Sequence, residues 1–170
     1  MTLRYLVLAL LYCLMASCSP SQEYTYEKQG IRFTCPEGWR ITDEETEESS
    51  SYLSVEREGL NSSGLWILTW VKGNRDLATH LQEFQESFGR HYLLDKTDIQ
   101  FGSLTEITFN NYPAVCSDYT ATIMGLRHRG RMYSFQQADK TFCIVRQEAL
   151  EDRLDNEAGF RLIEHSFSCD

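Results

Sequence analysis

One stripe of apolar residues predicts a helix near the middle of the chain. Leu77, Leu81, Phe84 and Phe88 recur at helical spacing, and glutamines and glutamates occupy the other side. Asp76 stands directly before the stripe, where an acceptor side chain can cap the first turn. We therefore expect an amphipathic helix that begins after Asp76 and ends near Gly89.

The stretch before this helix is typical of β-strands. Residues 65–71 are apolar on both faces, which indicates a strand covered by a layer on each side. Residues 31–35 alternate, residues 39–41 follow a turn, and residues 52–56 form a further predicted strand. Between them, residues 43–51 are acidic and then serine-rich, and we expect a solvated loop there rather than a calcium site.

A run of strands and one more helix follow. Strands are predicted by residues 105–109, 114–124, 131–137 and 141–147, with turns between them. The last helix is expected to be capped by Asp155 or Asn156 and to bury Phe160, Ile163 and Phe167. Strands, helix, meander and helix in this order predict an α+β fold with a largely antiparallel sheet and helices packed on its faces.

The first residues have the three zones of an export signal. Arg4 precedes the apolar run Tyr5–Leu14, which is too short to span a bilayer, and small residues lead to Cys18. This resembles a bacterial lipoprotein leader, which implies cleavage before Cys18 and acylation of that cysteine. We expect a signal peptide at 1–17, a lipid-anchored tether at 18–28 and one globular domain at 29–170. The resemblance also associates Ser19, which stands where Asp would alter sorting, with the outer membrane.

Charge and composition exclude several classes of protein. The net charge of -9 disfavours a nucleic-acid partner, and an aromatic content of 12% argues against disorder. The cysteines form no CxxC pair, so neither a zinc site nor thioredoxin-like chemistry is predicted. We expect no metal and no cofactor.

Catalytic motifs are not evident in the sequence. The histidines are scattered, and His80 is expected on the surface of the first helix. Glu164 and His165 could exchange a proton, although a structural role is favoured. Asp118 is expected to be exposed or paired with an arginine. Arg127, Arg129 and Arg131 crowd a predicted hairpin tip at 125–130, where they could contact an anion or a partner or simply be solvated. Trp66 and Trp70 share one strand and are expected in the core.

Short motifs along the domain resemble the PsbP family, named after an extrinsic protein of photosystem II. They are Ile31-Arg32-Phe33, Pro36-Glu37-Gly38-Trp39, Asn111-Tyr112-Pro113-Ala114, Phe142-Cys143-Ile144-Val145 and the closing Ile163-Glu164-His165-Ser166-Phe167. The resemblance implies an α/β/α sandwich and no shared catalytic residues. In that fold an intervening strand separates Cys116 from Cys143, whereas Cys35 and Cys169 lie at element ends. A Cys35–Cys169 disulfide is therefore the favoured bridge, with buried free thiols as the alternative.

These patterns predict a location more sharply than an activity. The leading hypothesis is a non-enzymatic lipoprotein of the bacterial envelope, held at the bilayer by Cys18, that binds or supports an unknown envelope protein. The alternative is a small-ligand carrier with a pocket between sheet and helix. A hydrolase of unrecognised type would need two titratable groups in one cleft.

Overall fold

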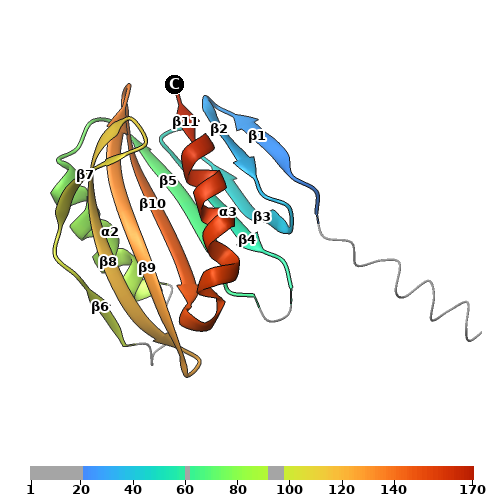
Figure 1. Ribbon diagram of the computed structural model, residues 1–170. Helices are drawn as coiled ribbons and strands as arrows, with labels where there is room; N and C mark the ends of the chain where they lie inside the picture. The colour runs from blue at the N-terminus through green and yellow to red at the C-terminus, as the bar shows by residue number, and fades with distance from the viewer. Residues whose placement is uncertain (1–20, 60–61, 92–97) are drawn as a thin grey trace, which may run out of the picture.

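The computed structural model describes residues 21–59, 62–91 and 98–170 (Figure 1). Two helices and two antiparallel sheets make up this part of the chain. The strands are β1 (Tyr24–Lys28), β2 (Ile31–Cys35), β3 (Trp39–Thr46), β4 (Ser50–Arg57), β5 (Leu65–Lys72), β6 (Ile99–Phe101), β7 (Thr105–Phe109), β8 (Tyr112–Ile123), β9 (Leu126–Gln137), β10 (Lys140–Ala149) and β11 (Ser168–Cys169). The helices are α2 (Leu77–His91) and α3 (Arg153–Ser166), with a short 3-10 turn, η1 (Leu150–Asp152), before α3.

The large sheet has eight strands, seven of which follow the order β3-β4-β5-β10-β9-β8-β6. β7 also pairs with β8, beside residues 112–116, while β6 pairs with residues 119–121. All these pairs are antiparallel. β5 lies inside this sheet and is largely buried on both faces, as its two-sided apolar sequence predicts.

Each face of the large sheet carries its own layer, which confirms the α+β sandwich. On one face α2 packs against β8, β9 and β10 and buries Leu81 and Phe88 with Met132. On the other face α3 packs on β10 and on β2 of the small sheet, and Phe160 and Ile163 are fully buried there. Trp66 and Trp70 are in the core as expected, with exposed fractions of 0% and 7%.

The small sheet corrects the expected tether. β1-β2-β11 forms a separate three-stranded sheet, and β1 pairs with β2 from Tyr24↔Cys35 to Lys28↔Ile31. Residues 24–28 therefore belong to the globular domain rather than to a tether that ends at residue 28. Their polar side chains are mostly exposed, which explains why the sequence suggested a linker.

Helix starts were predicted with mixed success. Asp76 caps α2 as expected, since the Thr79 backbone N–H donates to its Oδ1 at 2.9 Å. The predicted cap of α3 is wrong: the helix begins at Arg153, directly after η1, and Asp152 makes no capping hydrogen bond. Asn156 instead lies buried in the first turn and accepts a hydrogen bond from Arg57 Nη1 at 3.1 Å.

The acidic segment 43–51 is not the loop that we expected. β3 continues through it to Thr46 and pairs with β4, which already starts at Ser50. The side chains are mostly exposed, because this pair lies at the edge of the sheet. The backbone ladder with β4 thus outweighs the weak strand propensity of the acids.

The Cys35–Cys169 disulfide is not formed, and the four cysteines of the described part of the chain are buried free thiols. Cys169 of β11 pairs with Ile31, at the opposite end of β2 from Cys35. Four strand positions separate the two cysteines by about 13 Å, well beyond the reach of a disulfide. β9 separates Cys116 from Cys143 as expected.

Neither described helix is both long and apolar enough to cross a bilayer.

Candidate functional site

A band of charged side chains crosses the large sheet on the face that carries α3. The register places Asp118 of β8 opposite Arg131 of β9, and Arg131 opposite Arg146 of β10. Two positions further along, Thr120, Arg129 and Glu148 form a second such row. Because side chains alternate between faces of a strand, both rows point to the same side.

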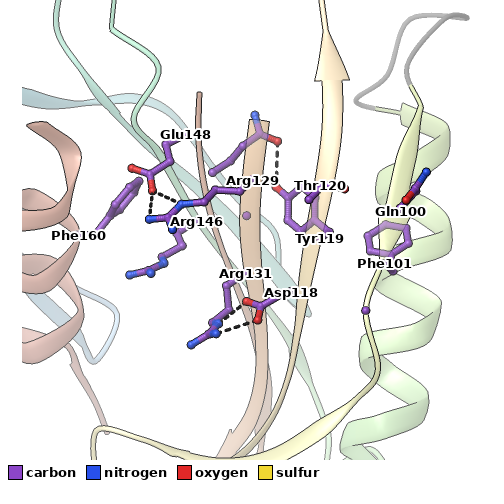
Figure 2. Close-up of a pocket in the computed structure, with 13 residues that line it drawn as sticks. Gln100, Phe101, Asp118, Tyr119, Thr120, Arg129, Arg131, Arg146, Glu148 and Phe160 are labelled. Carbon is purple, nitrogen blue, oxygen red and sulfur yellow. Dashed lines mark hydrogen bonds and ion pairs between the residues drawn. The ribbon is translucent and has the colours of Figure 1, made fainter. Parts of the chain in front are cut away.

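This band forms the floor of a groove of about 490 Å³, drawn in Figure 2. α3 packs on β10 and contributes Phe160 as one wall, and Gln100 and Phe101 of β6 lie on the other side. On this face α3 packs mainly on β2 and β10, whereas α2 covers β8 and β9 on the reverse. The groove exists because the helical layer is narrower than the sheet.

Arg131 and Asp118 form a bidentate ion pair in the groove. Arg131 Nε donates to Asp118 Oδ1 at 2.5 Å, and Nη2 donates to Oδ2 at 2.8 Å. The arginine holds the pKa of Asp118 below its ordinary value. The side chains are 39% and 65% exposed, so an incoming ligand can reach both.

Glu148 is held more deeply. Its side chain is only 4% exposed, and its Oε1 accepts from Arg129 Nε at 2.7 Å and from Nη2 at 2.5 Å. Its second oxygen, Oε2, is buried and has no hydrogen-bond partner among the described residues. A buried carboxylate oxygen without a donor is costly, so the hydrogen bonds from Arg129 are the main compensation for burying Glu148.

Arg146 links the groove to the helix. Its guanidinium lies over the ring of Phe160 at 5.5 Å and 3.5 Å from Glu164 Oε2. Burial raises the pKa of Glu164 to about 7, and the charge of Arg146 offsets only part of that effect. Glu164 therefore keeps its proton to a higher pH than an exposed glutamate would.

The structure places only two of the three arginines of the predicted cluster in the groove. The turn lies at Met124 and Gly125, so Arg127, Arg129 and Arg131 all lie on β9 and not at a hairpin tip. Arg129 and Arg131 enter the groove, but each is paired with an acid. Arg127 lies outside it, in a small hollow with Asp98 and Thr122.

The structure also shows where the other residues singled out from the sequence lie. Asp118 pairs with an arginine as expected. His80 is not on the surface: it is 7% exposed, and its Nδ1 lies 2.9 Å from Ser134 Oγ. Glu164 is largely buried, whereas His165 is exposed, so the two do not form a pair in one cleft. No group of three or more potential metal ligands occurs within the described ranges.

Sequence reasoning missed Arg146 and Glu148. Both lie near the end of an otherwise buried strand that was assigned to the core, and their partners are distant in sequence. Arg129 and Glu148 face one another only because β9 and β10 pair in one register. The sequence did offer one signal for this site, because Arg146 and Glu148 are charged residues that interrupt an apolar strand.

Comparisons with solved structures agree with this architecture. Cyanobacterial PsbP (CyanoP) from Synechocystis matches 91% of this chain and 95% of its own, with a TM-score of 0.60 at 10% identity. The chain has a PsbP-like fold. A comparison with protein-family models and with curated proteins gives no match.

Two further structures share this architecture. LpqN, described as involved in cell envelope biogenesis of Mycobacterium tuberculosis, matches 86% of this chain and 90% of its own, with a TM-score of 0.53 at 15% identity. A protein from Bacteroides thetaiotaomicron matches 88% of this chain with a TM-score of 0.56 at 10% identity, and this chain spans 48% of its length. At such low sequence identity, the structural similarity establishes the shared fold alone. The function of this chain must be inferred from its groove.

Proposed function

We propose that this PsbP-like protein is a non-enzymatic binding module of the bacterial envelope, anchored in the outer membrane by acylated Cys18. Its groove over β8, β9 and β10 would bind an envelope protein. The observation that carries the proposal is the accessible Arg131–Asp118 pair in an uncovered groove that also contains Arg129 and Arg146.

The charges of the groove favour a partner that carries carboxylates. Arginine binds a carboxylate through two parallel hydrogen bonds, and Asp118 already occupies Arg131 in this way. A carboxylate from a partner can replace Asp118, since both side chains of the pair are accessible to solvent. Arg146 lies nearby, over the Phe160 ring and 3.5 Å from Glu164 Oε2.

A binding role fits the lining better than a hydrolytic one. Among the described residues that line the groove, none is a serine, cysteine or histidine. Its two carboxyl groups, Asp118 and Glu148, are each engaged by an arginine. Nucleophilic catalysis usually needs a nucleophile within hydrogen-bond reach of a base.

The anchor is supported by the leader and by the start of the domain. Cys18 precedes Ser21 by three positions. Ser21 is already held by the domain, because its Oγ donates to the Trp39 carbonyl at 2.7 Å and its backbone N–H donates to Glu58 Oε2 at 2.9 Å. The described involvement of LpqN in cell envelope biogenesis is compatible with an envelope location for this chain.

A photo-crosslinking experiment in cells tests the partner. A photoreactive amino acid replaces Thr120 in the groove or, as a control, exposed Gln82 on α2. We expect a protein crosslink from position 120 that position 82 does not give and that Arg131→Ala reduces. A groove position that yields no protein crosslink in correctly located protein would contradict a protein partner.

The second candidate function is a small-ligand carrier. The volume of about 490 Å³ lies in the range of ordinary ligand pockets. Native mass spectrometry of gently purified protein would then show a bound small molecule that Arg131→Ala releases. A bound mass in the absence of any crosslink would favour this candidate over a protein partner.

The anchor has its own test. Cys18→Ser should leave a folded protein that moves from the detergent phase to the aqueous phase, because the acyl chains are lost. Unchanged partitioning of Cys18→Ser would contradict lipidation at this residue.

A further inference from the structure

Exposed apolar side chains gather at one end of the large sheet. Among the described residues, the large apolar side chains that are exposed are Met124 (95%), Leu154 (88%), Leu126 (47%), Leu150 (43%) and Tyr24 (39%). Met124 and Leu126 lie at the β8–β9 turn, and Leu150 and Leu154 lie in η1 and the first turn of α3. β10 ends beside the start of β9, with Ala149 opposite His128, so these two pairs of residues are neighbours.

A shallow hollow lies beside the turn and reaches the end of β10 and η1, although Leu150 and Leu154 do not line it. Ile123, Met124 and Leu126 line it from the turn, and Ala149 and Glu151 line it from the other side. Figure 1 shows the β8–β9 turn and the start of α3 at the same lower end of the sheet. We call Met124, Leu126, Leu150 and Leu154 the apolar end.

Methionine is an unusual choice for this turn. Met124 and Gly125 have φ values of 51° and 84°, the left-handed pair that a two-residue hairpin requires. Asn, Asp and Gly adopt this conformation most easily, whereas an unbranched apolar side chain gains nothing from it. Neither local conformation nor core packing therefore accounts for a 95% exposed methionine at this position.

Ser21, the first described residue, lies toward the same end of the strands. Ser21 is bound to Gly38, Trp39 and Glu58, at the start of β3 and the end of β4. Across the sheet, the Arg57 N–H of β4 donates to the carbonyl of Gly64, directly before β5, and Leu65 of β5 pairs with Gln147 of β10. The start of β3, the end of β10 and the β8–β9 turn therefore point toward the same end of the strands, with β3 and β9 four strand spacings, about 19 Å, apart across the sheet.

We propose that the apolar end rests in the bilayer interface beside the anchor, with Met124 and Leu126 inserted among the lipid head groups. This rests on the proposed acylation of Cys18. Three residues span at most about 11 Å, so a lipid on Cys18 would hold Ser21 close to the membrane. The adjoining end of the sheet is then the part of the domain that faces the bilayer.

The net charge of the residues at this end indicates which lipid head groups the apolar end would contact. Acidic residues outnumber basic ones there: Glu56, Glu58, Asp98, Glu151, Asp152 and Asp155 against Arg57, Arg127 and Arg153. An anionic surface would repel this set, whereas apolar insertion needs no positive patch. The apolar end thus suits a zwitterionic surface, such as one of phosphatidylethanolamine or phosphatidylcholine.

Quenching of tryptophan by brominated lipid tests the proposal. The acylated full chain with Leu126→Trp is reconstituted into phosphatidylcholine vesicles with and without brominated acyl chains. The matched control carries Asp139→Trp in the β9–β10 turn, at the opposite end of the sheet. The unsubstituted protein corrects for Trp39, Trp66 and Trp70, which are buried.

We expect bromine to quench the added fluorescence of Leu126→Trp several-fold more than that of Asp139→Trp. A second change, Met124→Asn, in the Leu126→Trp protein should lower that quenching and leave the melting temperature equal or higher, since Asn suits the turn. Replacing part of the phosphatidylcholine with phosphatidylglycerol should not increase quenching.

Flotation of the same vesicles separates this inference from the anchor. Protein that floats while Leu126→Trp and Asp139→Trp are quenched alike would overturn the apolar contact and leave the lipid anchor standing. Acylated protein that does not float would refute the anchor and, with it, the inference.

Discussion

The indole ring of Trp39 lies directly against Gly159 of α3. A β-carbon at Gly159 would lie 2.5 Å from Trp39 Nε1 and from Cε2, where no methyl group can fit. Trp39 is 3% exposed and meets the ring of Phe160 edge-on, with 5.2 Å between ring centroids. The glycine that weakens α3 as a helix is therefore the residue that lets α3 approach β3.

Gly159→Ala should destabilise the protein although alanine is the better helix former. We expect the free energy of unfolding to fall by about 1–3 kcal/mol, because the new methyl group overpacks the contact with Trp39. The matched control is Gly89→Ala in α2, where a β-carbon meets nothing within 4 Å. That change should raise stability by roughly 0.5–1 kcal/mol, and urea titrations measure both. A stabilised Gly159→Ala variant would refute the contact.

Trp39→Ala should lower the free energy of unfolding by about 3–5 kcal/mol, as for other buried aromatic residues. In the Trp39→Ala background, Gly159→Ala should no longer be destabilising, because the ring that it meets is gone. The double-mutant cycle measures this coupling. Additive effects of the two changes would show that they act independently.

Glu164→Gln should stabilise the protein in alkaline solution. Burial raises the pKa of Glu164 from 4.5 to about 7. The folded state thus holds this proton more tightly than the unfolded state, and the contribution of Glu164 to stability is lost as the pH rises from 4.5 to 7. Relative to the unchanged protein, we expect a gain of about 1–3 kcal/mol near pH 8 and little difference near pH 4.5.

The control for Glu164 is Glu157→Gln. Glu157 pairs with Arg161 at 3.0 Å, and this hydrogen bond lowers the pKa of Glu157. Its neutralisation should therefore bring no alkaline gain. Equal pH profiles for Glu164→Gln and the unchanged protein would show that Glu164 titrates normally.

His80 should make the protein sensitive to mild acid. Burial, assisted by the charge of Arg75, lowers the pKa of His80 below 6.5. The unfolded state therefore takes up this proton first, and stability falls as the pH drops below 6.5 towards the lower pKa of the folded state. His80→Gln, which can still contact Ser134, should remove this component between about pH 7.5 and pH 5.5.

Exposed His165 provides the comparison for His80. His165→Gln should leave the acid dependence unchanged, and thermal melts over the pH series of all three proteins give the readout. If His80→Gln behaves like His165→Gln, His80 is not the acid-sensitive group.

The sequence was most informative where one periodic pattern determined one element. The stripe from Leu77 to Phe88 and the cap at Asp76 located α2, and the apolar run of β5 indicated a covered strand. These signals are local, since the spacing of neighbours along the chain defines the buried face. The short edge strands carried no such signal, and β1, β6 and the end of β3 were missed for that reason.

The groove could not be predicted, because its residues are brought together by strand register and helix packing, which the linear sequence does not reveal. Arg129 meets Glu148, and Arg131 meets Asp118, because of cross-strand register, and a shift of one residue would turn these side chains to the other face. His80 was misplaced because its partner Ser134 lies on β9, across the α2 interface. The width of the helical layer, which leaves the groove open, follows from packing alone.

The edges of the large sheet are poorly suited to accepting another chain. Along β8, the backbone is divided between short β6 and β7, and Gly102 closes the interval by donating its N–H to the Asp118 carbonyl at 2.7 Å. At the other margin, β3 carries an irregularity between Ile41 and Asp43 and then a row of acids. Short strands, bulges and charge each discourage strand addition between molecules. The large sheet therefore offers few backbone positions for the cross-molecule ladders that lead to aggregation.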